Sequence, residues 1–299
     1  MHSLFRVLLT LFLLSTLDML QAQNKPAYLL FDAKGKSIKY RKMIKHLGKA
    51  EVILFGELHN NPIAHWLELE MLIDLQQKFP ERELQVGAEM FETHQQKNMD
   101  ALFAGDLKEE DFEKETDLWS NYPTDYRPIL RFCKEGGIPL SATNVPRRWA
   151  RMVSKEGPES LANLSEKEQQ LLPPLPYPID YELPSYAAMK DLMGGHGGGM
   201  NLNYFIAAQA IKDASMAHQI LQSFSEDVLY YHLNGSYHSD NKEGIAWYLE
   251  HYRPGTRIQN ITVVEQSQLN SLSEEHLGKA DFIILVPSNM TKTYLTGFE

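Results

Sequence analysis

The sequence predicts an α/β fold: a mostly parallel central sheet flanked by helices, with an inserted smaller helical domain. Up to Asn144, short apolar runs alternate with segments whose apolar residues recur at about 3.6-residue spacing. This alternation is typical of parallel strands joined by covering helices. The pattern is interrupted by a proline- and glycine-rich stretch and resumes after residue 225. We therefore expect a core domain formed by residues 23–145 and 225–299, with residues 146–224 as the inserted helical subdomain.

The first 22 residues have the composition of a secretory signal peptide. Arg6 supplies the positive charge, residues 7–17 are apolar, and Leu20-Gln21-Ala22 offers a cleavage end. The apolar run is too short for a comfortable membrane span. We expect an exported protein, periplasmic or extracellular. Because the leader contains no cysteine, we expect the exported protein to be soluble rather than lipid-anchored.

Composition narrows the classes of function. An apolar fraction of 43% is sufficient for a real core. A formal net charge of −10 argues against nucleic acid as a partner, and we expect no polybasic patch for anionic lipid. Cys133 is the single cysteine, so it forms no internal disulfide and is best interpreted as a small core residue.

The first half of the core is expected to alternate strands and helices. Four apolar residues ended by Gly56 predict a buried strand over residues 52–55. Asn60 and Asn61 suit a helix N-cap and Pro62 suits the first helical position, so the next helix should begin there. That helix is expected over residues 62–79, and the other elements are strands over 28–31, 84–89 and 138–144 and helices over 39–48, from about residue 93, and over 128–135.

The second half begins with irregular structure and returns to the sheet. Prolines recur between residues 157 and 185, which excludes one long helix and predicts short helices joined by extended turns. A short helix over residues 189–193 should lead into a glycine-rich loop that carries His196. Residues 201–224 form the clearest amphipathic helix. The remaining elements are expected as strands over 228–234, 258–264 and 281–286 and a helix that runs through Tyr248.

Polar side chains stand at the carboxyl ends of four expected strands. A Gly-x-x-His sequence follows two of them and contributes Glu57, His59 and His238, while Glu89 and Asn144 end two others. Taken singly, each residue is better explained as a helix cap or a surface residue. Parallel strands, however, end at one edge of their sheet, where ligands bind in such folds. Their shared position therefore predicts one site.

Other residues of the inserted segment are candidate ligand contacts. Arg147 lies in the first turn of an expected helix, where the helix dipole favours anions and disfavours a cation. Either an anionic ligand that pairs with the guanidinium or simple exposure to solvent explains a cation at this position. Gln209 and Asp213 are four residues apart and share a helix face. His196, flanked by methionines, is a candidate contact for a soft metal or haem, and the alternative is a flexible linker.

Several stretches in the same order resemble the ChaN-like haem-binding uptake family. The resemblance runs from about residue 50 to 265. The stretches that carry it are Phe-Gly-Glu-Leu-His-Asn-Asn (55–61), Gly-Ala-Glu-Met-Phe-Glu (87–92), Asp-Tyr-Arg-Pro-Ile-Leu (125–130), Ile-Pro-Leu-Ser-Ala-Thr-Asn-Val-Pro-Arg (138–147), Ala-Gln-Ala-Ile-Lys-Asp-Ala-Ser-Met-Ala (208–217) and Asn-Gly-Ser-Tyr-His-Ser-Asp (234–240).

This family is related in fold to the Tiki metalloproteases, the TraB proteins and the erythromycin esterases. The resemblance implies a parallel-sheet α/β domain with a helical insert, and an exported, iron-regulated protein. One mode described for the family holds two stacked haems between two subunits through tyrosine, which implies a homodimer and outer-membrane uptake machinery as partners. Many relatives are lipoproteins, and this chain departs from them in lacking the leader cysteine.

Two functions of different classes follow. The first is haem binding for iron acquisition, with a tyrosinate or imidazole as axial ligand and a propionate paired with Arg147. The second is an esterase or peptidase. In it, His59 and His238 bind Zn, Mn or Fe together with Glu89, or alternatively with Glu57, or a histidine acts as general base with Glu57 or Glu89 orienting it. The sequence leaves both functions open, so it does not decide whether the protein is an enzyme. The candidate ligand contacts are Asn144, Arg147, Gln209, Asp213, His196 and Tyr186.

Overall fold

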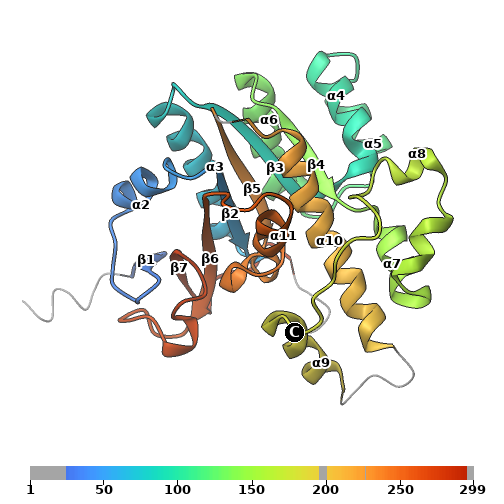
Figure 1. Ribbon diagram of the computed structural model, residues 1–299. Coiled ribbons are helices and arrows are strands. Elements are labelled where there is room, and N and C mark those ends of the chain that lie inside the picture. The colour runs from blue at the N-terminus through green and yellow to red at the C-terminus, as the bar shows by residue number, and fades with distance from the viewer. Residues whose placement is uncertain (1–24, 195–200, 226, 295–299) are drawn as a thin grey trace, which may run out of the picture.

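A seven-stranded sheet forms the centre of the protein, as Figure 1 shows. The computed structural model describes residues 25–194, 201–225 and 227–294, so the expected leader and His196 lie outside the described residues. The strand order is β1-β7-β6-β2-β5-β3-β4. Only β1 runs antiparallel among the described strands, on the edge beside β7, which confirms the mostly parallel sheet. The strands are β1 (Leu29–Asp32), β2 (Val52–Glu57), β3 (Glu83–Glu92), β4 (Leu140–Asn144), β5 (Val228–Gly235), β6 (Ile258–Gln266) and β7 (Phe282–Pro287).

Helices connect the strands and cover both faces of the sheet (Figure 1). The α-helices are α2 (Tyr40–Leu47), α3 (Pro62–Lys78), α4 (Gln96–Ala104), α5 (Glu109–Glu115), α6 (Arg127–Gly136), α7 (Arg147–Glu156), α8 (Glu166–Gln169), α9 (Pro184–Gly194), α10 (Leu202–Gln222) and α11 (Ile245–Tyr252). Shorter helical turns are η1 (Thr93–Gln95), η2 (Tyr122–Tyr126), η3 (Pro158–Asn163), η4 (Ser236–His238), η5 (Asp240–Lys242) and η6 (Glu274–His276). Among the described residues, no helix combines the length and the apolar character that a membrane span requires.

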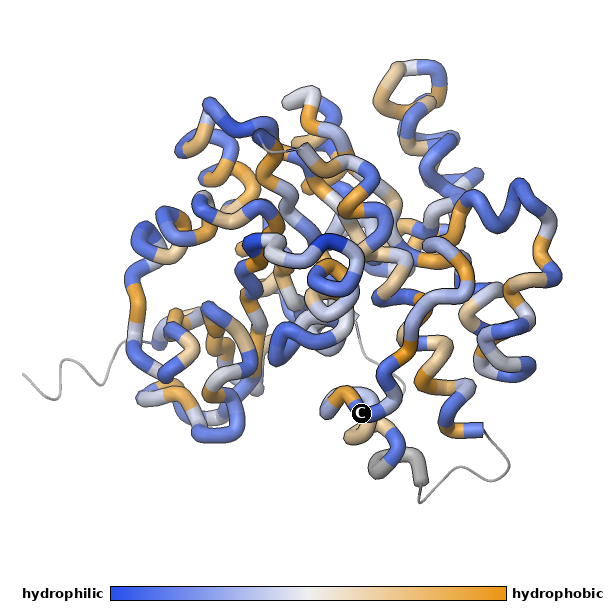
Figure 2. Tube along the Cα trace, viewed as in Figure 1, coloured by the Kyte–Doolittle hydropathy of each residue, from blue (hydrophilic) through white to orange (hydrophobic). Residues whose placement is uncertain are grey.

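Alternate residues of β2 belong to different hydrophobic cores. Ile53 and Phe55 pack with α2, α3 and α6, whereas Val52 and Leu54 pack with α7, α10 and α11. This division follows from the two-residue period of a strand, which sends successive side chains to opposite faces. Figure 2 shows the hydrophobic residues concentrated along the central strands and the inner sides of the helices. Residues 146–224 share the second core with the sheet, and their status as a separate subdomain stays a prediction.

The start of α3 follows the sequence expectation. Asn61 is its N-cap, because its side-chain oxygen accepts hydrogen bonds from the amides of Ile63 and Ala64 at 3.0 and 3.2 Å. Pro62 occupies the first helical turn, where it leaves no backbone donor unpaired. The loop between Glu57 and Asn61 is therefore short and closed by a well-capped helix.

The connections around β2 and β5 create a crevice at the carboxyl edge of the sheet. From β2 the chain passes through α3 to β3, on one side of β2, whereas from β5 it passes through α11 to β6, on the other side. Because α3 and α11 belong to the cores on opposite faces, the two connections diverge at this point. Such a divergence is where ligands bind in open α/β sheets.

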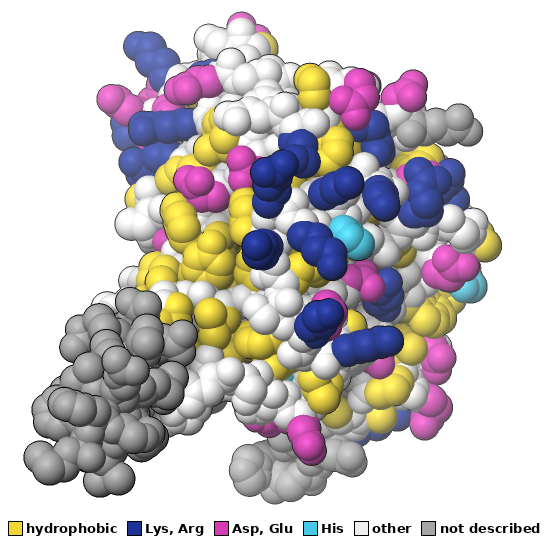
Figure 3. Space-filling view, turned by 90° about the vertical axis from the view of Figure 1, so that its left-hand side faces the viewer, with side chains coloured by type: hydrophobic (Ala, Val, Ile, Leu, Met, Phe, Trp, Pro, Cys, Tyr) yellow, Lys and Arg dark blue, Asp and Glu magenta, His cyan; other side chains and the backbone are white. Residues whose placement is uncertain are grey.

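The expectation that the acidic protein has no polybasic patch is wrong. Figure 3 looks onto the side of the molecule that carries α2, where Lys and Arg side chains gather. No acidic residue occurs between Asp32 and Glu51, so the net charge of −10 does not describe this surface. The exposed cations of this segment are Lys34, Lys36, Lys39, Arg41, Lys42, Lys45 and Lys49.

Candidate functional site

Glu89 and His238 meet at the carboxyl edge of the sheet. His238 Nε2 lies 3.3 Å from Glu89 Oε1, and the amide of Gly235 donates to Glu89 Oε2 at 2.8 Å. On its other side, His238 Nδ1 lies 2.6 Å from Asp213 Oδ1 of α10, and the Tyr186 hydroxyl of α9 donates to Asp213 Oδ2 at 2.7 Å. The four side chains form one chain of hydrogen bonds and ion pairs that joins α9 and α10 to β3.

Glu57 and His59 form the second half of the site. His59 Nδ1 donates to Glu57 Oε1 at 2.5 Å, and the Tyr126 hydroxyl donates to the same oxygen at 2.7 Å. Glu57 is buried, whereas 36% of the His59 side chain is exposed, so His59 can meet a ligand while Glu57 orients it.

The glycine of the second Gly-x-x-His sequence brings the two halves together. A Cβ atom added at Gly235 would lie 2.8 Å from His59 Nε2 and 3.6 Å from Glu89 Oε2. No side chain fits at that position without displacing His59. Glycine therefore lets His59 approach the end of β5 beside Glu89, and the strand-end residues meet in one site.

The charges of the Glu89–His238 pair support each other. Burial opposes the charge on Glu89, but the His238 cation outweighs this effect and holds the pKa of the Glu89 carboxyl far below its usual range. Burial likewise opposes the charge on His238, yet the carboxylates of Glu89 and Asp213 raise its pKa to about 10. His238 is therefore an imidazolium at neutral pH.

A deeper group lies behind Glu57, where α3 faces the end of β2. His65 Nδ1 lies 3.3 Å from Glu57 Oε2 and 3.1 Å from Glu68 Oε2. Burial and the Glu57 carboxylate raise the pKa of Glu68 well above its usual value, so Glu68 retains its proton. Burial opposes the charge on His65, but Glu57 and Glu68 raise its pKa to about 11. Among the described residues, Glu57, His65 and Glu68 are the group whose potential metal-ligand atoms lie within 4.8 Å of one another.

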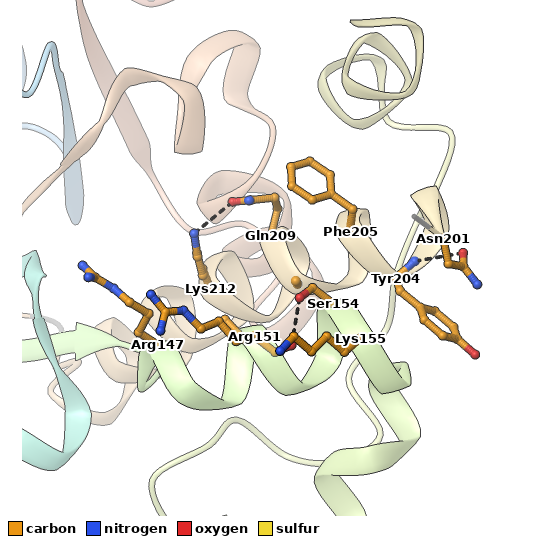
Figure 4. A pocket seen from close by; sticks show the side chains of 11 residues that line it. Arg147, Arg151, Ser154, Lys155, Asn201, Tyr204, Phe205, Gln209 and Lys212 are labelled. Carbon is orange, nitrogen blue, oxygen red and sulfur yellow. Dashed lines mark hydrogen bonds between the residues drawn. The ribbon is translucent and has the colours of Figure 1, made fainter. Parts of the chain in front are cut away.

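Two cavities lie beside these residues. One, of about 420 Å³, is lined by His59, Trp119, Asn121, Tyr294 and Arg147 together with neighbouring residues. The other, of about 750 Å³, is a groove between α7 and α10. Figure 4 shows Arg147, Arg151 and Lys155 along α7, opposite Gln209 and Lys212 on α10. Arg147 lines both cavities and thereby links the strand-end site to the groove.

Comparison with known proteins decides the family. The family described as "Haem-binding uptake, Tiki superfamily, ChaN" matches residues 43–249, which is more than half of the chain. The chain belongs to this ChaN family. The resemblance stated from the sequence motifs is thereby confirmed.

A solved structure at low sequence identity shares this fold. The structure of ChaN of Campylobacter jejuni with cofacial haem is similar with a TM-score of 0.66 and 16% identity, and the match covers 87% of this chain and 96% of that one. A Bacillus cereus protein gives a TM-score of 0.48 at 9% identity, over 87% of this chain and 94% of that one.

A curated relative matches a shorter region. The chloroplastic protein RETICULATA-RELATED 5 of Arabidopsis thaliana is 29% identical over 142 residues. The match covers 45% of this ChaN-family chain and 18% of the plant protein, so the chain corresponds to a small part of that relative.

The described candidate ligand contacts lie in three places. Arg147 and Gln209 line the groove of this ChaN-family protein. Tyr186 and Asp213 are buried and belong to the chain of contacts around His238. Asn144 donates to the Glu89 carbonyl at 3.2 Å and so supports the end of β3.

The two arginines that open α7 differ in their surroundings. The guanidinium of Arg148 lies 4.8 Å from the ring centroid of Trp149, so a cation–π contact stabilises this cation at the start of α7. Arg147 instead lines the two cavities.

The sequence reasoning missed several residues of these sites. Tyr126 lies in the stretch 125–130 that carries the family resemblance, but no sequence pattern predicts that its hydroxyl donates to Glu57. His65 and Glu68 are spaced i, i+3 on an otherwise apolar helix face, which was a readable signal. The cations that α7 contributes to the groove have helical spacing, yet Arg151 and Lys155 were not predicted. Tyr204 and Lys212 of α10 were also not predicted.

Proposed function

We propose that this protein binds haem in the groove between α7 and α10. The observation that carries the proposal is the lining of the groove, which holds four cations and no carboxylate in an acidic protein. Haem presents two propionates, and charge-assisted hydrogen bonds to Arg and Lys are the strong ones for such groups. The cations are Arg147, Arg151, Lys155 and Lys212.

The other end of the groove suits the porphyrin and its iron. Tyr204 and Phe205 are partly buried there and offer aromatic surface. A Cβ atom at Gly157 would lie 3.0 Å from the Tyr204 ring, so glycine leaves space for this ring beside η3. A tyrosine oxygen is a known axial ligand of haem iron, which makes Tyr204 our choice. Tyr186 is less suited because it is buried and its hydroxyl donates to Asp213.

Titration of the mature chain with haemin tests this proposal through the Soret absorption. Tyr204→Phe should remove the visible bands of a tyrosinate ligand and weaken binding. Arg151→Gln should weaken binding about tenfold, because one hydrogen bond to a charged group is worth about 1.5–3 kcal/mol, less when it is exposed. The matched controls are Tyr181→Phe, which lines a different cavity, and Lys167→Gln on α8. Wild-type affinity and spectra in both groove variants would exclude the groove.

The family and the predicted leader support a physiological role for haem binding. The protein is exported through residues 1–22 and takes part in haem and iron acquisition with an outer-membrane uptake system. Intact-mass measurement of protein expressed with its leader should show these residues missing. Full-length protein that stays in the cytosol would contradict export.

Two chains pair through their haems in this proposal. The solved Campylobacter jejuni relative has cofacial haem, and the groove here opens to solvent on one side, where a second haem can stack. Light scattering during gel filtration should show dimers with haemin and monomers without it. A haemin-bound monomer would rule out this arrangement.

Hydrolysis is a second candidate, favoured by one observation. His59 is partly exposed beside Gly235 and Glu89, and Asp213 orients His238 against the same carboxylate. A histidine held in this way can serve in general acid–base catalysis. The test is turnover of p-nitrophenyl acetate and of peptide substrates. His59→Ala should abolish turnover and leave the haemin Soret band, whereas equal turnover in wild type and variant would exclude this candidate.

A further inference from the structure

Three side chains from two elements converge beneath His59, away from the groove. Glu57 ends β2, while His65 and Glu68 come from the first two turns of α3. Their side chains are 0, 4 and 0% exposed. Because residues three apart on a helix face the same side, His65 and Glu68 both point at the end of β2.

The distances within this group match those around a metal ion. The His65 Nδ1 atom lies 3.3 Å from Glu57 Oε2 and 3.1 Å from Glu68 Oε2. Nitrogen and carboxylate ligands bind zinc at about 2.0–2.2 Å, which places neighbouring ligand atoms roughly 3.0–3.5 Å apart. His65 Nδ1 is thus at coordination spacing from both carboxyl groups, and the three ligand atoms all lie within 4.8 Å of one another.

Two carboxylate oxygens in this group are left without a hydrogen bond. They are Glu57 Oε2 and Glu68 Oε1, both inaccessible to solvent. A buried carboxylate oxygen without a donor is costly, because its hydration is lost and not replaced. The His65 ring lies within 3.3 Å of carboxyl oxygens of Glu57, Glu68 and Asp125, so acidic side chains surround it. A divalent cation would satisfy both oxygens.

The surroundings also hold the ligands in place. The second oxygen of Glu57 accepts from Tyr126 and His59, which leaves Oε2 free to point at His65. His65 Nε2 donates to the His59 carbonyl at 3.0 Å and lies 3.3 Å from Asp125 Oδ2. An imidazole whose far nitrogen binds a carbonyl or carboxylate is typical of metal-bound histidine.

We propose that Glu57 Oε2, His65 Nδ1 and a Glu68 oxygen bind one divalent transition metal ion. One imidazole and two carboxylates suit Zn²⁺, Mn²⁺ or Fe²⁺. This site differs from the set His59, His238 and Glu89, and it does not depend on haem binding. Glu57 bridges the ion to His59, so occupancy changes the electrostatic environment of the exposed histidine.

Crystals of the wild-type chain soaked in ZnCl₂ give a direct test that needs no variant. An anomalous difference peak is expected within about 2.0–2.2 Å of the three ligand atoms. A peak between His59, Glu89 and His238, or no peak at either position, would overturn the proposal.

Calorimetric titration of the EDTA-treated chain with Zn²⁺ gives an independent test. Glu68→Gln is isosteric and should weaken Zn²⁺ binding by more than the roughly 10–100-fold that is typical when a residue that only orients a metal ligand is changed. Glu70→Gln is the matched control, since it lies on the same helix and is partly exposed. Glu89→Gln should bind as wild type does. Wild-type affinity in Glu68→Gln, or loss of binding in Glu89→Gln, would refute the assignment.

Discussion

His238→Gln should destabilise the protein in a manner that depends on pH. The side chain is 8% exposed and lies between Glu89 and Asp213, which keep it protonated in the folded state. Its pKa is raised to about 10, while an unfolded histidine titrates near about 6.5. The stability from this proton is fully present below pH ~6.5 and is lost as the pH rises through about 10.

The magnitude follows from the difference between these pKa values. A shift of roughly 3.5 pKa units corresponds to about 5 kcal/mol, which is of the order of the 3–5 kcal/mol lost when one partner of a buried ion pair is removed. Between pH ~7 and ~9 the unfolded state has lost the proton and the folded state retains it. The difference in unfolding free energy between wild type and variant should therefore shrink by about 1.4 kcal/mol per pH unit.

Urea unfolding followed by circular dichroism, at several pH values in EDTA, measures this difference. Comparing two proteins at each pH cancels the titrating groups that do not contact residue 238. His251→Gln, an exposed histidine on α11, is the matched control and should follow wild type at every pH. A wild-type advantage that stays constant from pH 7 to 9, or no advantage at pH 7, would refute the reasoning.

Three further predictions concern stability and are checked by the same unfolding measurement. Tyr126→Phe removes a buried hydrogen bond to Glu57 and should lower the unfolding free energy by about 1–3 kcal/mol; an unchanged value would contradict the assigned bond. Gly235→Ala places a Cβ atom against His59 Nε2 and should cost about 1–3 kcal/mol by overpacking, whereas a stabilised variant would contradict the contact. Asn61→Ala removes the N-cap of α3 and should cost about 0.5–2 kcal/mol; Asn61→Ser should recover most of this loss.

The fold and the strand-end residues could be predicted because they depend on simple periodic rules. Alternating strand and helix patterns predict a parallel sheet, and parallel strands end at one edge whatever their side chains are. The sequence therefore predicted that the strand-end residues share one site, and they lie together in the structure. These residues are Glu57, His59, Glu89 and His238.

The deeper contacts required the tertiary structure. Tyr126 reaches Glu57 from 69 positions away, through a turn that has no periodic signature. Asp213 and Tyr186, which were predicted to contact a ligand, are buried around His238 because α9 and α10 pack over the sheet edge. The groove forms only where α7 and α10 lie side by side. A sequence pattern determines which face a residue occupies, whereas packing between distant elements decides which faces meet.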